Sequence, residues 1–208
     1  MSKAYIVTGT DTGIGKTTVA AMLVLALDAV YWKPIQSGTE EGTDRQRVQA
    51  LTQLPDDRLL PERYVLSQPL SPHRAAELDG IEIKAEALAL PAFDRTLVIE
   101  GAGGLMVPVT RNKLQIDVFA DWSLPIILCA RTALGTINHT LLSIEALRGR
   151  HMRLHGLIFV GDDNPDNMRT IADFSGARIL GHVPRLDRIG RAALLDVFAR
   201  GFRREDFA

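Results

Sequence analysis

The sequence predicts an α/β fold, a three-layer α/β/α arrangement in which a mostly parallel central sheet lies between helices. Short apolar runs alternate along the chain with helical patterns. The apolar runs are nearly continuous in valine, isoleucine and leucine, which is typical of strands buried on both faces. The chain has 208 residues, 46% of them hydrophobic, which suits one domain over residues 1–208.

The predicted elements follow one another in a regular order. Strands are expected over residues 5–7, 30–32, 96–100, 125–130, 156–160 and 178–182. Helices are expected over residues 17–28, 44–52, 137–148, 165–174 and 191–202. Residues 55–72 contain several prolines and are expected to be irregular. Ligands bind beyond the carboxyl ends of such strands, which directs attention to the loops after residues 7, 32, 100, 130 and 160.

Composition argues against several classes of function. Lysine plus arginine number 24 and aspartate plus glutamate 25, so there is no global basic field for nucleic acid. The single cysteine, Cys129, lies in an apolar run, which favours a buried core thiol. The N-terminus has no signal-peptide pattern, and the nine-residue apolar run 19–27 is shorter than the roughly 20 residues of a membrane span. We therefore expect a cytoplasmic protein that binds neither nucleic acid nor membrane.

The strongest motif is Gly-Thr-Asp-Thr-Gly-Ile-Gly-Lys-Thr-Thr at residues 9–18, between the first strand and the first helix. A phosphate-binding loop has this position, with backbone N–H groups around an anion at the positive end of the helix. Lys16 is expected to reach the β- and γ-phosphates, and the Thr17 hydroxyl to bind Mg²⁺. Five residues separate Gly9 from Gly15, one more than in the common pattern. The motif predicts a P-loop NTPase fold with phosphate contacts from Gly13, Ile14, Gly15, Lys16, Thr17 and Thr18.

Three charged residues are candidates to complete this site. Glu100 ends a buried strand that faces the loop, where a second metal-holding group belongs. Asp44 opens a helix and by itself is better explained as a first-turn or N-cap acid than as a metal ligand. Lys33 ends the second strand, and its side chain points either into the ligand crevice or to solvent.

Several ordered segments resemble dethiobiotin synthetases, and together they span nearly the whole chain. They are the loop at residues 8–17, Lys-Pro-Ile-Gln-Ser-Gly at 33–38, Asp44, Ser-Pro-His at 71–73, Ile-Glu-Gly-Ala-Gly-Gly at 99–104 and Leu-Gly-Thr-Ile-Asn-His at 134–139. The resemblance implies an ATP-dependent cyclo-ligase of biotin biosynthesis. Such an enzyme joins CO2 to 7,8-diaminononanoate through a carbamate and a carbamic–phosphoric anhydride, with ATP as co-substrate and Mg²⁺ as cofactor.

The resemblance also implies roles for individual residues. Catalytic roles fall to Lys33, Lys16 and Thr12. Metal binding falls to Thr17, Asp44 and Glu100. Besides the loop, the ATP contacts fall to Asp44, Glu100, Gly101, Ala102, Gly103, Pro184, Arg185 and Leu186. Substrate contacts fall to Thr12, Ser37, Gly104, Gly135, Thr136, Ile137 and Asn138. The last four residues open a helix, and the family's homodimer binds the substrate carboxylate there, across the subunit interface.

Two departures and two alternatives accompany the resemblance. Val160 stands where many relatives read adenine with an asparagine, and Gly13 stands where some have glutamate. One alternative is a ParA/MinD-like ATPase switch, but its additional signature lysine is absent from residues 9–12. Another is the synthetase domain of a cobyrinate amidase, for which 208 residues leave no glutaminase domain. His73 and His139 have no visible acid or nucleophile partner, which favours structural roles.

Overall fold

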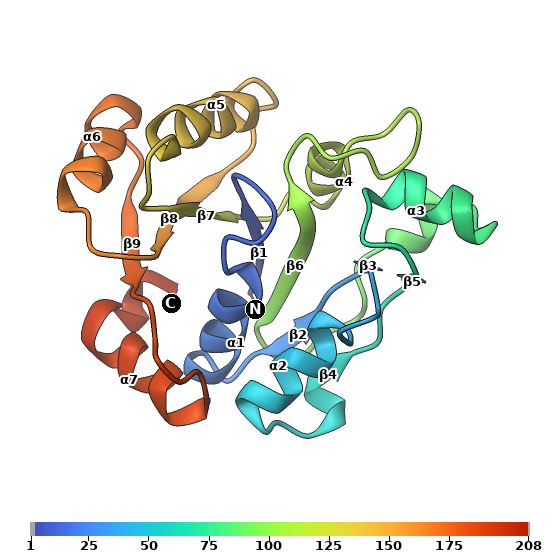
Figure 1. Ribbon diagram of the computed structural model, residues 1–208, viewed down its shortest axis with the longest axis horizontal. Coiled ribbons are helices and arrows are strands. Elements are labelled where there is room, and N and C mark those ends of the chain that lie inside the picture. The colour runs from blue at the N-terminus through green and yellow to red at the C-terminus, as the bar shows by residue number, and fades with distance from the viewer. Residues whose placement is uncertain (1–2, 208) are drawn as a thin grey trace.

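The structure, a computed structural model, describes residues 3–207 and has a seven-stranded sheet at its centre (Figure 1). The strands of this sheet are ordered β4-β2-β6-β1-β7-β8-β9. They span β1 Ala4–Gly9, β2 Val30–Trp32, β4 Leu59–Leu60, β6 Leu97–Gly104, β7 Ile126–Arg131, β8 Leu154–Val160 and β9 Ile179–Val183. Every ladder between these strands is parallel, which confirms the predicted sheet.

Helices cover both faces of the sheet. They are α1 Lys16–Ala26, α2 Asp44–Thr52, α3 Pro72–Asp79, α4 Gln115–Trp122, α5 Thr136–Arg148, α6 Pro165–Ser175 and α7 Arg191–Gly201. Short 3₁₀ turns occur at Asp56–Arg58, Ala85–Leu88 and Arg204–Phe207. One face of the sheet packs against α1, α2 and α7, and the other packs against α4, α5 and α6.

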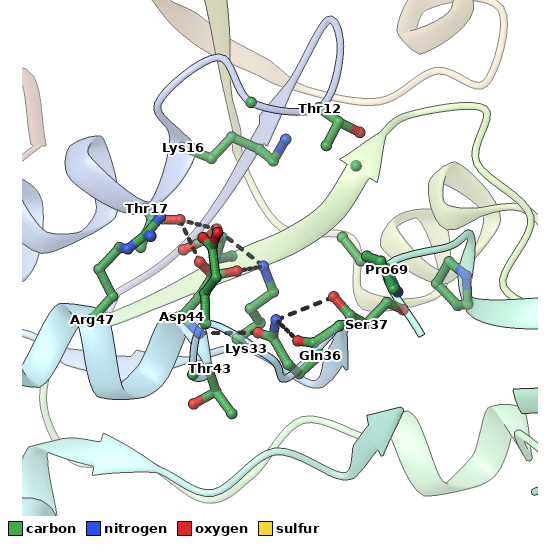
Figure 2. A pocket seen from close by; sticks show the side chains of 18 of the residues that line it. Thr12, Lys16, Thr17, Lys33, Gln36, Ser37, Thr43, Asp44, Arg47 and Pro69 are labelled. Atoms are coloured by element: carbon green, nitrogen blue, oxygen red, sulfur yellow. Dashed lines mark hydrogen bonds and ion pairs between the residues drawn. The ribbon is translucent and has the colours of Figure 1, made fainter. Parts of the chain in front are cut away.

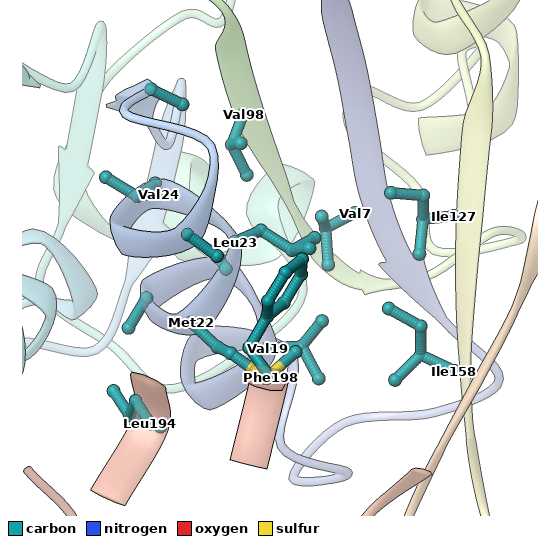
Figure 3. Close-up of a cluster of buried hydrophobic side chains, with 14 of the residues drawn as sticks. Val7, Val19, Met22, Leu23, Val24, Val98, Ile127, Ile158, Leu194 and Phe198 are labelled. Atoms are coloured by element: carbon teal, nitrogen blue, oxygen red, sulfur yellow. The ribbon is translucent and has the colours of Figure 1, made fainter. Parts of the chain in front are cut away.

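The core around α1 shows why this helix is fixed in place (Figure 3). Val19 and Leu23 of α1 are fully buried with Val7 of β1 and Val98 of β6. Apolar residues surround α1 on nearly every side, as expected of a helix packed between a sheet and two other helices. Because the start of this helix carries the phosphate-binding loop, the buried core sets the position of the loop.

The region between β2 and β6 differs from the prediction. Residues 55–72 are not wholly irregular, because β4 extends the main sheet and β5 (Tyr64–Leu66) pairs in parallel with β3 (Ile35–Ser37). This second, two-stranded sheet packs with α3 around Ile35, Leu66 and Ala75. Strands of two or three residues are too short to show the alternation on which sequence prediction depends. The small sheet carries residues 36–38 to the carboxyl edge of the main sheet.

No helix within residues 3–207 is both long and apolar enough to span a membrane.

Candidate active site

The loop after β1 has the shape of a phosphate-binding loop. Gly15 precedes α1 with φ of 94°, a conformation that residues with a side chain rarely adopt. At Gly9, a Cβ atom would lie 2.2 Å from Cδ1 of Ile14, so only glycine allows the loop to close over β1. Ile14 is itself buried in the core against α1. The loop between Gly9 and Gly15, which is one residue longer than usual, is therefore anchored in the core by Ile14.

Lys16, the first residue of α1, lines the site from within the loop. Its Nζ donates to the backbone oxygen of Asp11 at 2.8 Å. Burial lowers the pKa of Lys16, while the negative charge of Glu100 acts in the opposite direction. The buried ammonium group stands in the position from which a P-loop lysine contacts phosphate oxygens.

Two carboxylates meet the Thr17 hydroxyl at the carboxyl edge of the sheet. Thr17 Oγ1 lies 2.8 Å from Oε1 of Glu100 and 3.1 Å from Oδ1 of Asp44. Glu100 comes from β6 and Asp44 from the first turn of α2, which Thr43 and Gln46 cap reciprocally. The N-cap of α2 is thus Thr43, so the helix does not need Asp44 as its cap. Asp44 instead lies beside Thr17, which also contacts Glu100, so the three predicted metal-binding residues come together.

Lys33 completes a charged cluster, which we define as Thr17, Lys33, Asp44 and Glu100 (Figure 2). Lys33 Nζ forms an ion pair with Oδ2 of Asp44 and another with Oε1 of Glu100 at 3.2 Å. Burial would lower the pKa of Lys33, but the two carboxylates outweigh burial and the pKa is raised. Burial also acts to raise the pKa of Asp44, and Lys33 reverses this so that the pKa is lowered. The crevice orientation of Lys33, which the sequence left open, is therefore the one observed.

Two residues that sequence reasoning missed support this cluster. The Tyr31 hydroxyl donates to Oε2 of Glu100 at 2.9 Å, with both side chains buried. Gln36 accepts the backbone N–H of Asp44 at 3.1 Å and donates to the carbonyl of Gly38 at 3.0 Å. Tyr31 could have been suspected, because it precedes Lys33 by two residues and so shares a face of the strand with it. Nothing in the sequence pattern singles out Gln36.

A cavity of about 920 Å³ opens beside the charged cluster, and most of the predicted site residues line it. Those that do are Thr12, Gly13, Gly15, Lys16, Thr17, Thr18, Lys33, Ser37, Asp44, Glu100, Ala102 and Gly103. The opposite wall comes from residues 69–72, which lead into the first turn of α3. The Ser37 hydroxyl is buried there without a hydrogen-bond partner among the described residues. An unpaired hydroxyl at a cavity wall is suited to bind a polar ligand group.

A second cavity of about 670 Å³ lies on the other side of the loop, beyond β8 and β9. Gly13, Ile14 and Gly15 line it, as do Val160 and Arg185. Arg185 pairs with Asp162 at 3.1 Å, and both side chains are mostly exposed.

The one asparagine on the wall of the second cavity already has partners. Asn164 caps α6 through the backbone N–H of Asn167, and its amide also donates to the carbonyl of Thr132. The wall of this cavity is therefore poor in fixed, buried groups that could read a base.

Several predicted site residues lie away from both cavities. Pro184 and Leu186 flank Arg185 but do not line the second cavity, and Gly104 does not line the first. The space at Gly101 is occupied by Phe119, because a Cβ there would lie 2.7 Å from its ring. Gly101 therefore packs closely against Phe119 in the core, and its contact with ATP stays a prediction.

The start of α5 stands apart as well. Neither cavity is lined by Gly135, Thr136, Ile137 or Asn138. The Thr136 hydroxyl donates to the carbonyl of Arg131 at 2.5 Å, so its hydrogen is used within the fold. Leu134 and Gly135 are exposed, although Thr132 and Ala133 just before them line the second cavity.

The donor set of the charged cluster fits magnesium. Residues 3–207 contain no group of three or more histidine, cysteine, aspartate or glutamate side chains that could hold a metal by themselves. Two carboxylates and one hydroxyl do converge, all with oxygen donors. Magnesium is commonly held by one or two carboxylates with phosphates and water as its remaining ligands. The cluster thus suits a metal that arrives with a nucleotide.

Comparison with known proteins identifies relatives over the full length of the chain. A family model described as an AAA domain matches residues 3–193. The chain is 58% identical to ATP-dependent dethiobiotin synthetase BioD of Rhodopseudomonas palustris strain TIE-1, with 100% of this chain and 98% of that protein covered. It is 55% identical to the protein of the same name from Novosphingobium aromaticivorans, with 99% of both covered.

Solved structures with the same fold are far more distant in sequence. The septum site-determining protein MinD of Pyrococcus horikoshii, complexed with Mg-ADP, has a TM-score of 0.62 and 13% identity over 94% of this chain and 86% of its own. A ParA family ATPase from Chlorobium tepidum has a TM-score of 0.53 and 12% identity, covering 96% of this chain and 98% of its own. At this identity the likeness shows the P-loop fold alone.

Proposed function

The chain belongs to the family of ATP-dependent dethiobiotin synthetases, and we propose that it joins CO2 to 7,8-diaminononanoate and closes the cyclic urea of dethiobiotin. The observation that carries this proposal is the charged cluster, in which Lys33 links Asp44 to Glu100 at the wall of the first cavity. The class of enzyme is a cyclo-ligase that consumes ATP. Residues 1–208 would act as one catalytic domain in the cytoplasm.

The reaction needs little covalent participation from the protein. One substrate amine adds to CO2 and loses a proton, which gives a carbamate. A carbamate oxygen attacks the γ-phosphorus of ATP, and the bond to ADP breaks. The second amine then attacks the carbamoyl carbon, the ring closes, and phosphate leaves with a second proton released. Carbamate and phosphoryl groups are both anionic, so cations fixed beside them lower the barrier.

The residues of the first cavity can be assigned to these steps. Lys16 would contact the β- and γ-phosphates, and Lys33 would stabilise the charge that passes between carbamate and phosphate. Both ammonium groups are buried, where their charge is screened less than it would be in water. Thr12 and Ser37 would hydrogen-bond the carbamate or the amine. The remaining catalysis is positioning, because the cavity holds both reactants close together.

Magnesium would be held by Thr17, Asp44 and Glu100 together with the phosphates, and it would supply charge neutralisation of the triphosphate. Thr17 and Asp44 point toward one another (Figure 2), and the Thr17 hydroxyl contacts a carboxylate oxygen of Asp44 and one of Glu100. Lys33 already pairs with both carboxylates, which holds them in place before any ligand arrives.

We further propose a homodimer in which the partner binds the substrate carboxylate. Support comes from the start of α5, where Leu134 is fully exposed and the backbone N–H groups of a helix end are presented. Of the predicted residues Gly135, Thr136, Ile137 and Asn138, Thr136 donates its hydroxyl to the carbonyl of Arg131 and its backbone N–H to the carbonyl of Ala133. The main-chain N–H groups of the other three would bind the carboxylate. The ParA/MinD-like alternative has fold likeness in its favour and no observation at the site.

The test is incorporation of ¹³C-bicarbonate into dethiobiotin, followed by mass spectrometry with purified protein, Mg-ATP and 7,8-diaminononanoate. The proposal predicts one labelled carbon in the cyclic urea and none when ATP is omitted. ATP hydrolysis without labelled product, under conditions in which the protein is folded, would overturn it.

A further inference from the structure

The carboxylate of Glu100 has two oxygens with different surroundings. Oε1 faces the cavity side, where it contacts Oγ1 of Thr17 at 2.8 Å and Nζ of Lys33 at 3.2 Å. Oε2 points into the fold and accepts one hydrogen bond, from the hydroxyl of Tyr31 at 2.9 Å. Glu100 is 1% exposed, so water does not compete for either oxygen.

The geometry of two neighbouring strands produces this division. β2 pairs in parallel with β6, and Tyr31 lies opposite Val98, two residues before Glu100. Tyr31 and Lys33 are two residues apart and therefore project to the same face as Val98 and Glu100. β2 thus brings the Tyr31 hydroxyl to one oxygen of the carboxylate, and the residue directly after β2, Lys33, brings an ammonium group to the other.

Tyr31 is well suited to hold a carboxylate. Its ring is fully buried in the same core cluster as Val7 and Leu23, so it has little freedom to move. Its hydroxyl lies 2.9 Å from Oε2 of Glu100 and donates to it, with both side chains buried.

We propose that Tyr31 is a positioning residue, whose hydrogen bond to Oε2 of Glu100 leaves Oε1 as the oxygen that faces Thr17, Lys33 and the magnesium–triphosphate ligand. The inference rests on the proposed function, because it names how that site orients one of its metal-holding groups. Without the hydroxyl, Oε2 would be buried and unpaired, and the carboxylate would rotate to recover a partner. Groups that orient metal ligands in this way commonly contribute about 10–100-fold to metal affinity.

Tyr5 provides a matched control. It is also buried in this core cluster, and its hydroxyl donates to a backbone carbonyl, that of Phe207, at 3.0 Å. This bond lies at the opposite end of β1 from the phosphate-binding loop. Tyr5→Phe and Tyr31→Phe therefore each remove one buried tyrosine hydroxyl, but only the second change touches the site.

The experiment measures by calorimetry how much Mg²⁺ tightens ATP binding, as the ratio of Kd in EDTA to Kd in excess Mg²⁺. Tyr31→Phe is expected to reduce this ratio by about tenfold, with the Kd in EDTA unchanged. Tyr5→Phe is expected to keep the wild-type ratio. Equal ratios in the two variants, with binding intact, would overturn the positioning role alone. Absence of Mg-ATP binding in the wild-type protein would overturn the proposed function together with it.

A second measurement does not depend on the folding of any Tyr31 variant. The chain has three tyrosines, so uniform 3-fluorotyrosine labelling gives three ¹⁹F signals. Tyr5→Phe and Tyr64→Phe assign two of them, and the third is that of Tyr31. Mg-ATP is expected to shift the Tyr31 signal more than metal-free ATP does, and to leave the Tyr5 signal in place. An unmoved Tyr31 signal would contradict the inference.

Discussion

The two sides of the phosphate-binding loop are built in opposite ways. On the side of β2 and β6, Lys33 and Glu100 of the charged cluster are buried, Thr17 and Asp44 are half-buried, and each carboxylate has at least two partners. On the side of β8 and β9, the second cavity is bordered by Val160, an exposed Arg185–Asp162 pair, and an asparagine that caps a helix. The first side holds its charged groups in place before a ligand binds. The second side offers an exposed wall with few fixed polar groups.

The difference indicates which side of the loop contributes to catalysis and which contributes only to nucleotide binding. Buried charges held in place by the protein act strongly on a transferring phosphoryl group, because no reorganisation is needed at the moment of reaction. Exposed ion pairs contribute little to energy and adapt their geometry. We therefore expect variants of the first side to change catalysis and variants of the second side to change nucleotide affinity slightly.

The largest effect is expected for Lys33→Ala. The change removes the cation that we propose acts on the carbamate, and it leaves Asp44 and Glu100 without their ion pair. The rate of dethiobiotin formation should fall about 10³-fold. Breaking a buried pair also destabilises the fold by about 3–5 kcal/mol, which chemical denaturation will measure. Lys84→Ala, at an exposed position that does not line the first cavity, is the control. A loss of less than tenfold in Lys33→Ala would contradict the role.

A smaller effect is expected for Gln36→Ala. Gln36 accepts the backbone N–H of Asp44, so its loss frees the first turn of α2 to shift. We expect kcat/KM for Mg-ATP to fall about tenfold, as is usual for groups that orient metal ligands. Gln49→Ala is the matched control, because Gln49 belongs to α2, the helix that Asp44 begins, and donates to Asp56 away from the site. Equal kinetic constants in the two variants would contradict a role of Gln36 in positioning Asp44.

Cys129 lies between the two sides, in β7 next to β1, and predicts a pH dependence of stability. Burial raises the pKa of this thiol from 9.0 to about 12. The unfolded thiol ionises first, so the folded state loses stability as pH rises from about 9 toward 12, and the thiol makes no difference below pH 9. The slope from one proton is at most about 1.4 kcal/mol per pH unit. The free energy of unfolding of the wild-type protein should therefore fall more steeply than that of Cys129→Ala over this range; parallel curves would refute the prediction.

The smallest effect is expected for Arg185→Ala. Its exposed guanidinium pairs with Asp162 and can at most stack on a base, which is worth about 0.5–1 kcal/mol at such a site. KM for ATP should rise by about threefold with kcat unchanged. A loss of kcat by more than tenfold would show that the second side takes part in catalysis, which would contradict the division of roles between the two sides.

Sequence reasoning was most successful where structure is local. The helix over residues 44–52 has the predicted bounds, since Thr43 and Gln46 form a capping box that marks its start. The phosphate-binding loop was recognisable because a strand, glycines and a helix must follow one another in the chain. The parallel sheet followed from the apolar runs.

What the sequence did not provide depends on register and packing. The contact of Tyr31 with Glu100 requires β2 to pair with β6, 66 residues further on in the chain at Val30 and Thr96. The close packing of Gly101 against the ring of Phe119 joins two residues that no sequence pattern links. The short strands β3 and β5 have three residues each and become visible only when they pair. Such features follow from tertiary contacts that no local pattern encodes.

The most direct test of the proposed synthetase activity is phosphate release by the purified protein in Mg-ATP and bicarbonate, measured with and without 7,8-diaminononanoate. Release is expected to depend strongly on the diamine and to be lost in Lys33→Ala. Release at the same rate without the diamine would contradict it.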